Sequence, residues 1–443
     1  MTTALNAMIH GRVLQPGNDD YDSSRSVWNA MVDRRPRYIV QCSETADVVA
    51  AVRFATDHGL DVGIRCGGHG IVGHAVPEDG LMIDLRPMGE VSIDARARRA
   101  RVQGGALLGA LDAAAQAVGL ATTAGNVSHT GVGGLTLGGG MGWLARQHGL
   151  SCDNVVSFEI VTAAGETLRA SADSHPDLYW ALRGGGGNFG VVTEFEFALH
   201  PEPGLALTAE FRYPVTGARD AMRRWRDLND DAPRQATYSA TIADATVALG
   251  LVWVGDPGDG DAQVSALAEG LAEAAGPQSS AIERWSYVDL QRREDDIEAH
   301  AWRRYWKGHY FSELGDEVID AVLERDGDDL PNVSLQAYGG AIAEIPDEQT
   351  AFSGRDTAFE FVAASKWHDA AEDERRMSAA RRYAATMDRF ANGVYVNALA
   401  DEGVAGVRRA YSDAKLERLS TVKRHYDPGN VFHHNQNITP SAG

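Results

Sequence analysis

Glycine residues that could hold a ligand against the backbone gather in three stretches of the first 200 residues. The sequence Gly67-Gly68-His69-Gly70 comes first, residues 125–142 follow with eight glycines in eighteen residues, and residues 184–190 form the third. Glycine permits positive φ angles and a close approach of the backbone, and its free amide groups can bind phosphate. Two dense glycine loops therefore indicate a phosphate-bearing cofactor, although one such loop alone is equally typical of tight turns.

The third stretch matches the G-x-G-x-x-G pattern at residues 185–190. A dinucleotide fingerprint of this kind must follow a strand and open a helix. Here the pattern follows a predicted helix over 177–182 and precedes a predicted strand over 191–199, so its context is inverted. A Rossmann site is therefore excluded, and the sequence has neither a Walker A lysine nor a His-Glu-x-x-His zinc signature.

The elements that would position these loops change in character along the chain. Up to about residue 203, short predicted strands alternate with helices, such as those over 43–59 and 106–118, and a Pro- and Gly-rich boundary follows at 200–204. Beyond it, predicted strands over 205–213, 238–254, 333–343 and 357–365 join helices over 264–275 and 372–391. This second region predicts an antiparallel sheet with helices on one face, and hence an α+β protein.

Composition excludes several classes of function. The 443 residues contain 41 Lys and Arg against 62 Asp and Glu, a net charge of −21, which disfavours binding to nucleic acid or to anionic lipid. Cys42, Cys66 and Cys152 are too scattered for a disulfide framework or a structural zinc site. No apolar run approaches the ~20 residues of a membrane helix, and the N-terminus lacks a signal-peptide core, so a cytoplasmic location is expected.

Four segments in this order carry a resemblance to a known family. They are residues 65–70 (RCGGHG), 131–140 (GVGGLTLGGG), 180–190 (WALRGGGGNFG), and the tail with YDPGN at 426–430 and NQNI at 435–438. Together they span most of the chain. The set resembles the FAD-linked oxidases of the vanillyl-alcohol oxidase superfamily, in its berberine-bridge-enzyme-like branch.

The resemblance implies a two-part FAD-binding domain of the PCMH type, with an inserted antiparallel-sheet substrate domain. The expected boundaries are 1–203 for the FAD-binding domain, 204–395 for the substrate domain, and 396–443 for a segment that returns to the FAD-binding domain. The family places the following residues at the cofactor: Arg65, Cys66, Gly67, Gly68, His69, Gly70, His129, Thr130, Gly131, Gly133, Gly134, Leu135, Gly138, Gly139, Gly140, Gly142, Asn188, Gly190, Val192, Asn435 and Asn437.

In this family the histidine at the position of His69 is joined covalently to the flavin. Many relatives add a second bond from a cysteine four residues before the Gly-Val-Gly-Gly motif, but Val127 stands there in this chain. The resemblance therefore implies a single covalent bond, through His69, as in the mono-covalent bacterial members. Thr130 replaces the valine that oxidase relatives often have near the oxygen-reactive face of the flavin.

The substrate side is less well defined by the sequence. Relatives often use a tyrosine of a Tyr-x-Asn-Tyr segment as the base, but this chain has Ala398 at the position of the second tyrosine. The remaining candidates are Glu360, Tyr338 and Tyr310. Glu360 interrupts an apolar strand and either faces a dry cleft or lies on the surface, and Tyr338 is either an active-site or a packing residue. The aromatic stretch around Tyr310, from 302 to 311, either lines a pocket or, given its helical spacing, packs in the core.

A metal is not expected. His433 and His434 are adjacent, and adjacent side chains of a strand point to opposite faces, which disfavours binding of one ion.

The expected activity is oxidation of a C–O or C–N carbon of a small secondary-metabolite-like or sugar-like substrate, by hydride transfer to FAD, with O2 as acceptor and H2O2 as product. Two alternatives remain open: a flavin-dependent oxygenase or oxidative cyclase, and a non-catalytic small-molecule-binding protein with the same fold.

Overall fold

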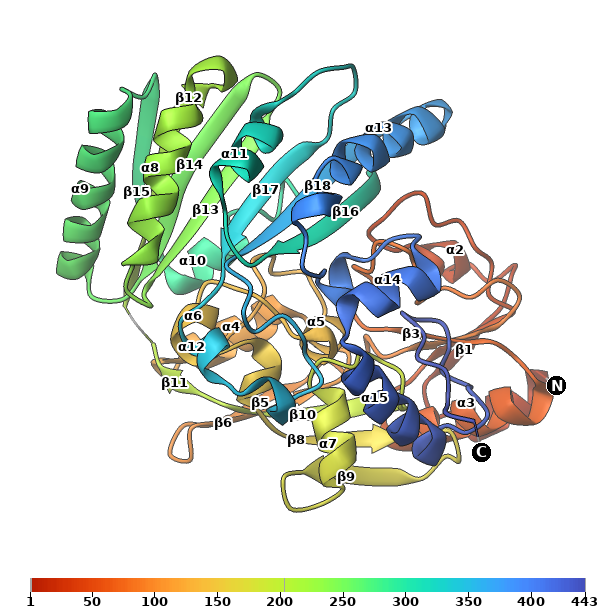
Figure 1. The fold of residues 1–443 in the computed structure, drawn as a ribbon. Coiled ribbons are helices and arrows are strands. Elements are labelled where there is room, and N and C mark those ends of the chain that lie inside the picture. Colours follow the sequence, from red (N-terminus) through yellow and green to blue (C-terminus); the bar gives the residue numbers. More distant parts are fainter. Residues whose placement is uncertain (1, 203, 443) are drawn as a thin grey trace.

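A computed structural model describes residues 2–202 and 204–442, and Figure 1 shows its layers. The expected domain boundary at Pro203 lies outside the described residues. A large sheet with helices on one face forms the upper part of the view, and two smaller sheets with their helices form the lower part. The last part of the chain, in blue, returns to the lower part and ends near the N-terminal region.

The first sheet is mixed and has four strands within the described residues. Its order is β1 (Arg12–Leu14), β2 (Tyr38–Gln41), β4 (Leu81–Asp84) and β3 (Val62–Arg65). β2 and β3 both run parallel to β4, while β1 is antiparallel to β2. The helices of this region are α1 (Thr2–Met8), α2 (Tyr21–Arg25) and α3 (Thr45–His58). α3 ends at Gly59 with φ of 61°, a left-handed conformation that glycine adopts without strain.

The second sheet is antiparallel. Its order is β5 (Val91–Asp94), β6 (Arg99–Gln103), β10 (Val191–Ala198), β8 (Val155–Val161) and β9 (Thr167–Ser171). A short pair, β7 (Leu120–Ala121) with β11 (His200–Pro201), lies beside it. The associated helices are α4 (Leu108–Gln116), α5 (Val132–Gly138), α6 (Ala145–His148) and α7 (Pro176–Leu182).

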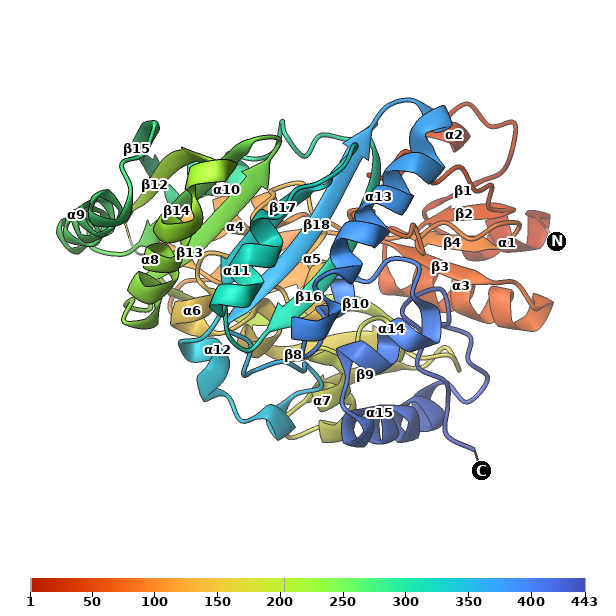
Figure 2. The same ribbon diagram turned by 45° about the horizontal axis from the view of Figure 1, so that its top comes forward.

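The third sheet is antiparallel, as the sequence predicts. Its order is β15 (Ser279–Ser286), β12 (Leu205–Pro214), β14 (Thr246–Val254), β13 (Ala236–Ala243), β17 (Asn332–Ala337), β18 (Phe359–Trp367) and β16 (Arg303–Phe311). Four helices cover one face, as Figure 2 shows: α8 (Arg219–Asp230), α9 (Pro257–Ala274), α11 (Asp316–Leu323) and α13 (Asp373–Ala385). The shorter helices α10 (Tyr287–Arg292) and α12 (Ala341–Glu344) lie in its connections.

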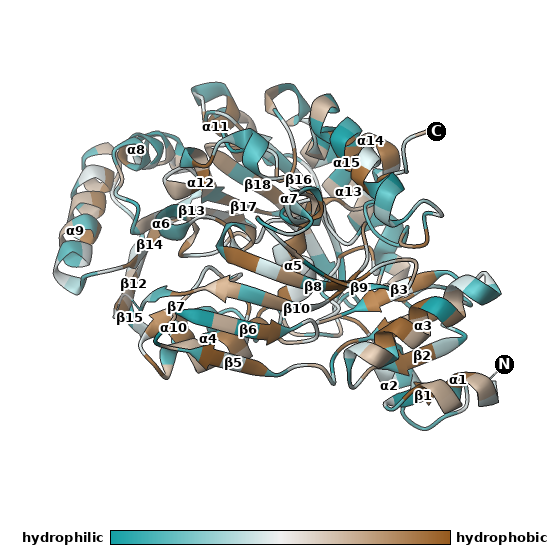
Figure 3. Ribbon diagram, turned by 90° about the horizontal axis from the view of Figure 1, so that it is seen from below, coloured by the Kyte–Doolittle hydropathy of each residue, from teal (hydrophilic) through white to brown (hydrophobic). Residues whose placement is uncertain are grey.

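The largest apolar core lies between this sheet and its four helices. Alternation along β18 buries Phe359, Phe361 and Ala363 in that core and turns Glu360 to the opposite face, toward the lower part of the molecule. Figure 3 colours the ribbon by hydropathy and shows hydrophobic residues along the strands and hydrophilic residues along much of α8. The helix-free face of the sheet is therefore the one available to a site.

The tail is formed by α14 (Gly403–Ala410), α15 (Asp413–Tyr426) and an irregular segment to residue 442. Ser412 begins α15 by accepting a hydrogen bond from the backbone amide of Lys415. Among the described residues, no helix combines the length and the apolar character that crossing a bilayer requires.

Several expectations about local structure were wrong. The strand expected over 238–254 is the β13–β14 hairpin, and the strand expected over 333–343 ends at Ala337 and is followed by α12. Residues 303–311 form strand β16 rather than a helix, because their aromatic residues pack on both faces of the sheet edge. The second glycine stretch is not a continuous loop but contains the short helix α5, which begins at Val132. Glycine lowers helix stability by about 1 kcal/mol per residue, so packing rather than propensity stabilises α5.

Candidate active site

The first two glycine motifs lie directly against each other. A Cβ atom added to Gly67 would stand 2.3 Å from the backbone nitrogen of Gly131, and one added to Gly131 would stand 2.5 Å from Sγ of Cys66. Only glycine permits this approach, because real Cβ contacts are longer. Residues 65–70 and residues 131–140 therefore form one continuous backbone surface.

The third motif and the tail close the same region. The backbone amides of Gly184 and Gly186 both donate to the carbonyl of Leu137 at the end of α5, at 3.0 and 2.9 Å. The side chain of Asn188 accepts a hydrogen bond from the amide of Ile438 at 2.9 Å. All four segments that carry the family resemblance thus meet in one place, although the last of these contacts joins residues 250 positions apart.

This place has the properties that a nucleotide cofactor requires. Cβ atoms added to Gly70, Gly134 or Gly187 would meet no atom within 4 Å, so their Cα atoms border open space. Buried side-chain oxygens of Asn126, Asn435 and Asn437 have no hydrogen-bond partner. Buried polar groups are normally paired, so these oxygens indicate that the site accommodates a polar ligand. The residues fit FAD.

The other residues expected at the cofactor differ in their surroundings. Arg65 is buried, donates to the carbonyl of Ser24, and has its pKa lowered to about 10 by burial. Burial raises the pKa of the Cys66 thiol to about 11, which makes it a poor nucleophile. Val192 lies in β10, where it pairs with Ile160, and Gly190 directly precedes that strand, where an added Cβ would stand 2.5 Å from the carbonyl oxygen of Val161.

His69 lies in a cluster of aromatic rings. Its ring stacks on Trp28 with centroids 4.8 Å apart, and its Nε2 lies 2.6 Å from Nδ1 of His129. Burial, with help from the nearby His129 and His300, lowers the pKa of His69 to about 2. The imidazole is therefore neutral at physiological pH and keeps a free lone pair.

The hydrogen-bond partners assign the tautomer of this pair. Nε2 of His129 faces the backbone carbonyl of Asp295 at 3.4 Å, which can only accept, so this nitrogen carries the hydrogen. Nδ1 of His129 then accepts from Nε2 of His69. Nδ1 of His69 is left as the acceptor of the Thr130 hydroxyl at 3.3 Å, and it is the nucleophilic nitrogen of the pair.

The three residues expected on the substrate side come together. Glu360 of β18 is paired across the sheet with Tyr310 of β16, and Tyr338 follows β17 directly. The Tyr338 hydroxyl lies 2.7 Å from Oε2 of Glu360 and 3.5 Å from the Tyr310 hydroxyl. Burial raises the pKa of Glu360 to about 7, although the Tyr338 hydrogen bond acts in the opposite direction. This carboxyl can therefore accept a proton near neutral pH.

Tyr395 connects this carboxyl to the second glycine motif. Its hydroxyl accepts hydrogen bonds from the backbone amide of Gly140 and from Nδ2 of Asn397, both at 2.9 Å. Tyr395 packs against the apolar cluster that contains Tyr310 and Tyr338, the two tyrosines beside Glu360. The expected carboxylate and the expected cofactor loop are thus neighbours in space.

A loop that the sequence did not single out completes this neighbourhood. Phe352 packs against Gly139, where an added Cβ would stand 2.7 Å from the ring, and its amide donates to the carbonyl of Arg183 at 3.0 Å. Phe352 also contacts Tyr395 edge to face. Its position in an irregular segment without a motif gave no signal in the sequence.

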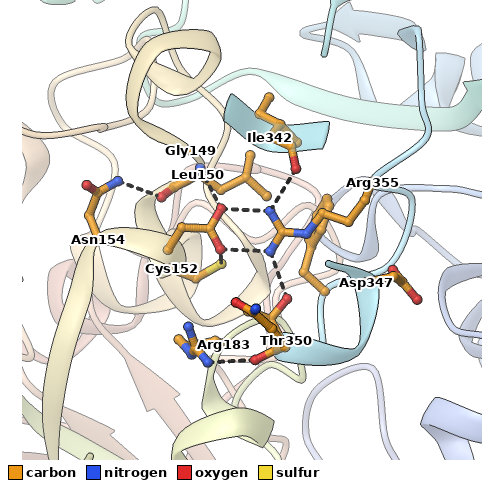
Figure 4. Close-up of polar contacts among 12 residues, drawn as sticks. Gly149, Leu150, Cys152, Asn154, Arg183, Ile342, Asp347, Thr350 and Arg355 are labelled. Carbon is orange, nitrogen blue, oxygen red and sulfur yellow. Dashed lines mark hydrogen bonds and ion pairs between the residues drawn. The ribbon is translucent and has the colours of Figure 1, made fainter. Parts of the chain in front are cut away.

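A buried ion pair holds this loop, as Figure 4 shows. Arg355 donates from two nitrogens to the two carboxylate oxygens of Asp153, each at 2.7 Å, and also to Thr350. The side chains of Arg355 and Asp153 are only 5% and 2% exposed. Asp153 belongs to the segment after the second glycine motif, so the pair fixes the Phe352 loop to the cofactor side.

Comparison with known proteins agrees with this geometry. Residues 36–171 match a family model described as an FAD binding domain, and residues 394–439 match one described as berberine and berberine like. The chain is 30% identical to (R)-6-hydroxynicotine oxidase of Paenarthrobacter nicotinovorans over 458 residues, covering 98% of both chains. It is 27% identical to glucooligosaccharide oxidase of Sarocladium strictum over 466 residues, covering 96% of this chain and 91% of that protein.

Solved structures show the same fold. The crystal structure of 6-hydroxy-D-nicotine oxidase from Arthrobacter nicotinovorans superimposes with a TM-score of 0.88 at 27% identity, covering 98% of each chain. The BBE-like 1 protein of Physcomitrella patens superimposes with a TM-score of 0.91 at 23% identity over the whole of both chains. The fold, the FAD-binding domain and these relatives lead to one conclusion: the chain belongs to the berberine-bridge-enzyme-like family of FAD-linked oxidoreductases.

Proposed function

We propose that this FAD-dependent oxidoreductase oxidises an alcohol or amine carbon of a small secondary-metabolite-like or sugar-like molecule, with Glu360 as the base. The observation that carries the proposal is the position of Glu360, a carboxyl with a raised pKa beside Tyr395, whose hydroxyl binds Gly140 of the second glycine motif. The relatives named for 6-hydroxynicotine and for glucooligosaccharides support both substrate classes.

FAD supplies a hydride acceptor when it is bound. The substrate carbon gives up its hydrogen with two electrons, the carboxylate of Glu360 takes the proton from the attached hydroxyl or amine group, and a C=O or C=N bond forms. Tyr338 orients the carboxylate through its 2.7 Å hydrogen bond. Molecular oxygen then takes up the two electrons with two protons and leaves as H2O2.

His69 is the proposed attachment point, and its neighbours have the properties that attachment requires. Nδ1 would supply the electron pair for a bond to the FAD, and Nδ1 of His129, 2.6 Å from Nε2 of His69, would take up the proton that the ring releases. The two electrons would be accepted by the flavin and passed to O2. Two further proposals follow the family: a single covalent bond, and a division into an FAD-binding part up to 203, a substrate part over 204–395 and a returning tail.

The test is anaerobic titration of the purified holoenzyme with a panel of sugars, benzylic alcohols and cyclic amines, followed by absorbance at the flavin bands. We expect at least one class to bleach the flavin within a single turnover, and re-admission of oxygen to release one equivalent of H2O2. If none of the compounds bleaches the flavin, the result would favour a binding protein. Incorporation of ¹⁸O from labelled oxygen into the product would favour an oxygenase.

A further inference from the structure

Two histidines of the tail meet a carboxylate at the start of β3, outside the candidate active site. Nε2 of His433 lies 3.3 Å from one carboxylate oxygen of Asp61, and Nε2 of His434 lies 3.4 Å from the other. The two imidazole centroids are 4.9 Å apart, and one ligand atom from each residue lies within 4.8 Å of the other two. Asp61 directly precedes β3, which leads into the first glycine motif.

The backbone explains how adjacent histidines can converge. The expectation that they point apart assumed an extended strand, but residues 431–434 form no strand. The irregular backbone, which follows a turn at Asn430 with φ of 51°, directs both rings to the same carboxylate. The geometric reason for excluding a shared ligand therefore does not apply.

The hydrogen bond at Nδ1 of His433 determines which ring nitrogen can act as a ligand at Asp61. Nδ1 of His433 is 2.9 Å from the carbonyl of Asn430, which can only accept, so Nδ1 carries a hydrogen. With that hydrogen on Nδ1, it is Nε2, the nitrogen that faces an oxygen of Asp61 at 3.3 Å, that can bind an ion. A backbone carbonyl that holds the remote N–H is the usual support of a metal-binding histidine, because it orients the ring and raises its basicity.

The distances also suit an ion. Ligands of tetrahedral Zn²⁺ at bond lengths of about 2.0–2.1 Å are separated from each other by about 3.3–3.4 Å. Each histidine nitrogen lies at this separation from a different oxygen of Asp61, so either oxygen of the carboxylate can serve as the ligand. The side chains of Asp61, His433 and His434 are 54%, 37% and 20% exposed, so water can complete the coordination. A nearby cation, Arg34, is held by the carbonyls of Val72 and Gly73.

We propose that Asp61, His433 and His434 bind Zn²⁺ or a similar divalent transition metal, with two nitrogen ligands, one oxygen ligand and water. The ion would have a structural effect on the tail. Asn435, the next residue, donates from Nδ2 to the carbonyl of Gly187 at 3.1 Å. Metal binding therefore fixes the tail to β3 on one side and to the third glycine motif on the other.

The experiment uses the full-length holoenzyme, stripped with EDTA and titrated with ZnCl₂ in competition with a chromophoric chelator. We expect one equivalent to bind, with at least tenfold weaker binding in Asp61→Asn and in His434→Ala. His425→Ala is the matched control, since His425 is an exposed histidine of α15 outside the trio. His300→Ala is a second control, because His69, His129 and His300 also lie close enough to share an ion. Both controls should bind as the wild type does.

Hydrogen exchange gives a second measurement that does not depend on a competing chelator. Zinc should slow amide exchange in residues 431–438 of the wild type at least tenfold, and should leave exchange in Asp61→Asn unchanged. The proposal is overturned if the wild type binds no stoichiometric zinc, if Asp61→Asn binds as tightly as the wild type, or if His300→Ala abolishes binding. None of these outcomes bears on the proposed oxidation, which the flavin titration tests separately.

Discussion

The hydroxyl group of Tyr338 donates a 2.7 Å hydrogen bond to Oε2 of Glu360 across neighbouring strands of the large sheet. A hydrogen bond to the ionised form of a carboxyl group lowers its pKa, whereas burial raises it, and here burial prevails. The result is a pKa of about 7, a value at which the carboxyl group can both take up and release a proton.

Replacement of Glu360 by Gln should slow flavin reduction by about 100-fold or more, the usual contribution of a general base. In the wild type, reduction should accelerate as the pH rises through about 7, because the base is active when deprotonated. Stopped-flow reduction across pH 5.5–9 measures both. The variant should lose this dependence, and Glu273→Gln, an exposed residue of α9, should keep it. A pH profile of E360Q identical to that of the wild type would show that Glu360 is not the base.

Glu360→Gln slows the reaction, but it should raise the stability of the folded protein at high pH. The folded state holds the Glu360 proton more tightly than the unfolded state, so this contribution to stability is complete below about pH 4.5 and is lost as the pH rises through 7. Glu360→Gln removes the buried charge. Its free energy of unfolding should match that of the wild type near pH 4.5 and exceed it at pH 8 by at most roughly 3 kcal/mol, at 1.36 kcal/mol per pKa unit. The melting temperature should differ accordingly at the two pH values. A constant difference across this range would contradict the raised pKa.

Replacement of His69 by Ala should abolish covalent flavin while leaving non-covalent binding in place. Acid precipitation should give a yellow pellet from the wild type and a colourless one from the variant. His129→Ala should still form the bond, but more slowly, because the Nε2 proton of His69 loses its acceptor 2.6 Å away. The time course of flavin fluorescence in denaturing gels, after FAD is added to apoprotein, measures this rate. His425→Ala serves as control, and a colourless wild-type pellet would refute covalent attachment.

Gly67→Ala should prevent the first two glycine motifs from meeting. The new Cβ would lie 2.3 Å from the backbone nitrogen of Gly131, so the two backbones must separate. We expect loss of FAD retention and a lower melting temperature of the apoprotein. Gly276→Ala is the control, since no atom lies within 4 Å of its added Cβ. Normal FAD content in Gly67→Ala would show that the close approach is dispensable.

Arg355→Met should destabilise the protein by about 3–5 kcal/mol, because it leaves the buried carboxylate of Asp153 without its charged partner. Arg212→Met removes an exposed ion pair with Glu210 and should cost less than about 1 kcal/mol. Thermal unfolding of both variants beside the wild type makes the comparison. Equal effects would mean that the Phe352 loop does not depend on the buried pair.

The sequence predicted the order of the main elements and their α+β character, because alternation and glycine placement are local signals. Alternation along β18 separates Glu360 from Phe359 and Phe361, but it does not say what covers each face. That depends on α8, α9, α11 and α13 packing on the phenylalanine side, which involves residues far away in the chain. Whether Glu360 meets bulk water or a cleft could therefore be answered only in three dimensions.

Other parts of the site left no local signal. The Phe352 loop has no regular pattern, and the Asp153–Arg355 pair joins residues about 200 positions apart. The helical spacing of aromatic residues in β16 was misleading, because both faces of that strand are covered in part and alternation is hidden. The prediction that the side chains of His433 and His434 point to opposite faces requires an extended backbone. The backbone turns at Asn430, so that requirement is not met.

The hydrogen bonds from Asn188 to the tail have a consequence for biosynthesis. Oδ1 of Asn188 is satisfied by the amide of Ile438, and Nδ2 also donates to the carbonyl of Gln436. These partners leave the ribosome about 250 residues after Asn188, whereas the sheets that support Asn188 are made earlier and can fold first. A chain that has not yet reached residue 436 thus has the glycine motifs but lacks the hydrogen bonds between Asn188 and the tail. Completion of the site is therefore coupled to the synthesis of residues 436–438, long after the glycine motifs have been made.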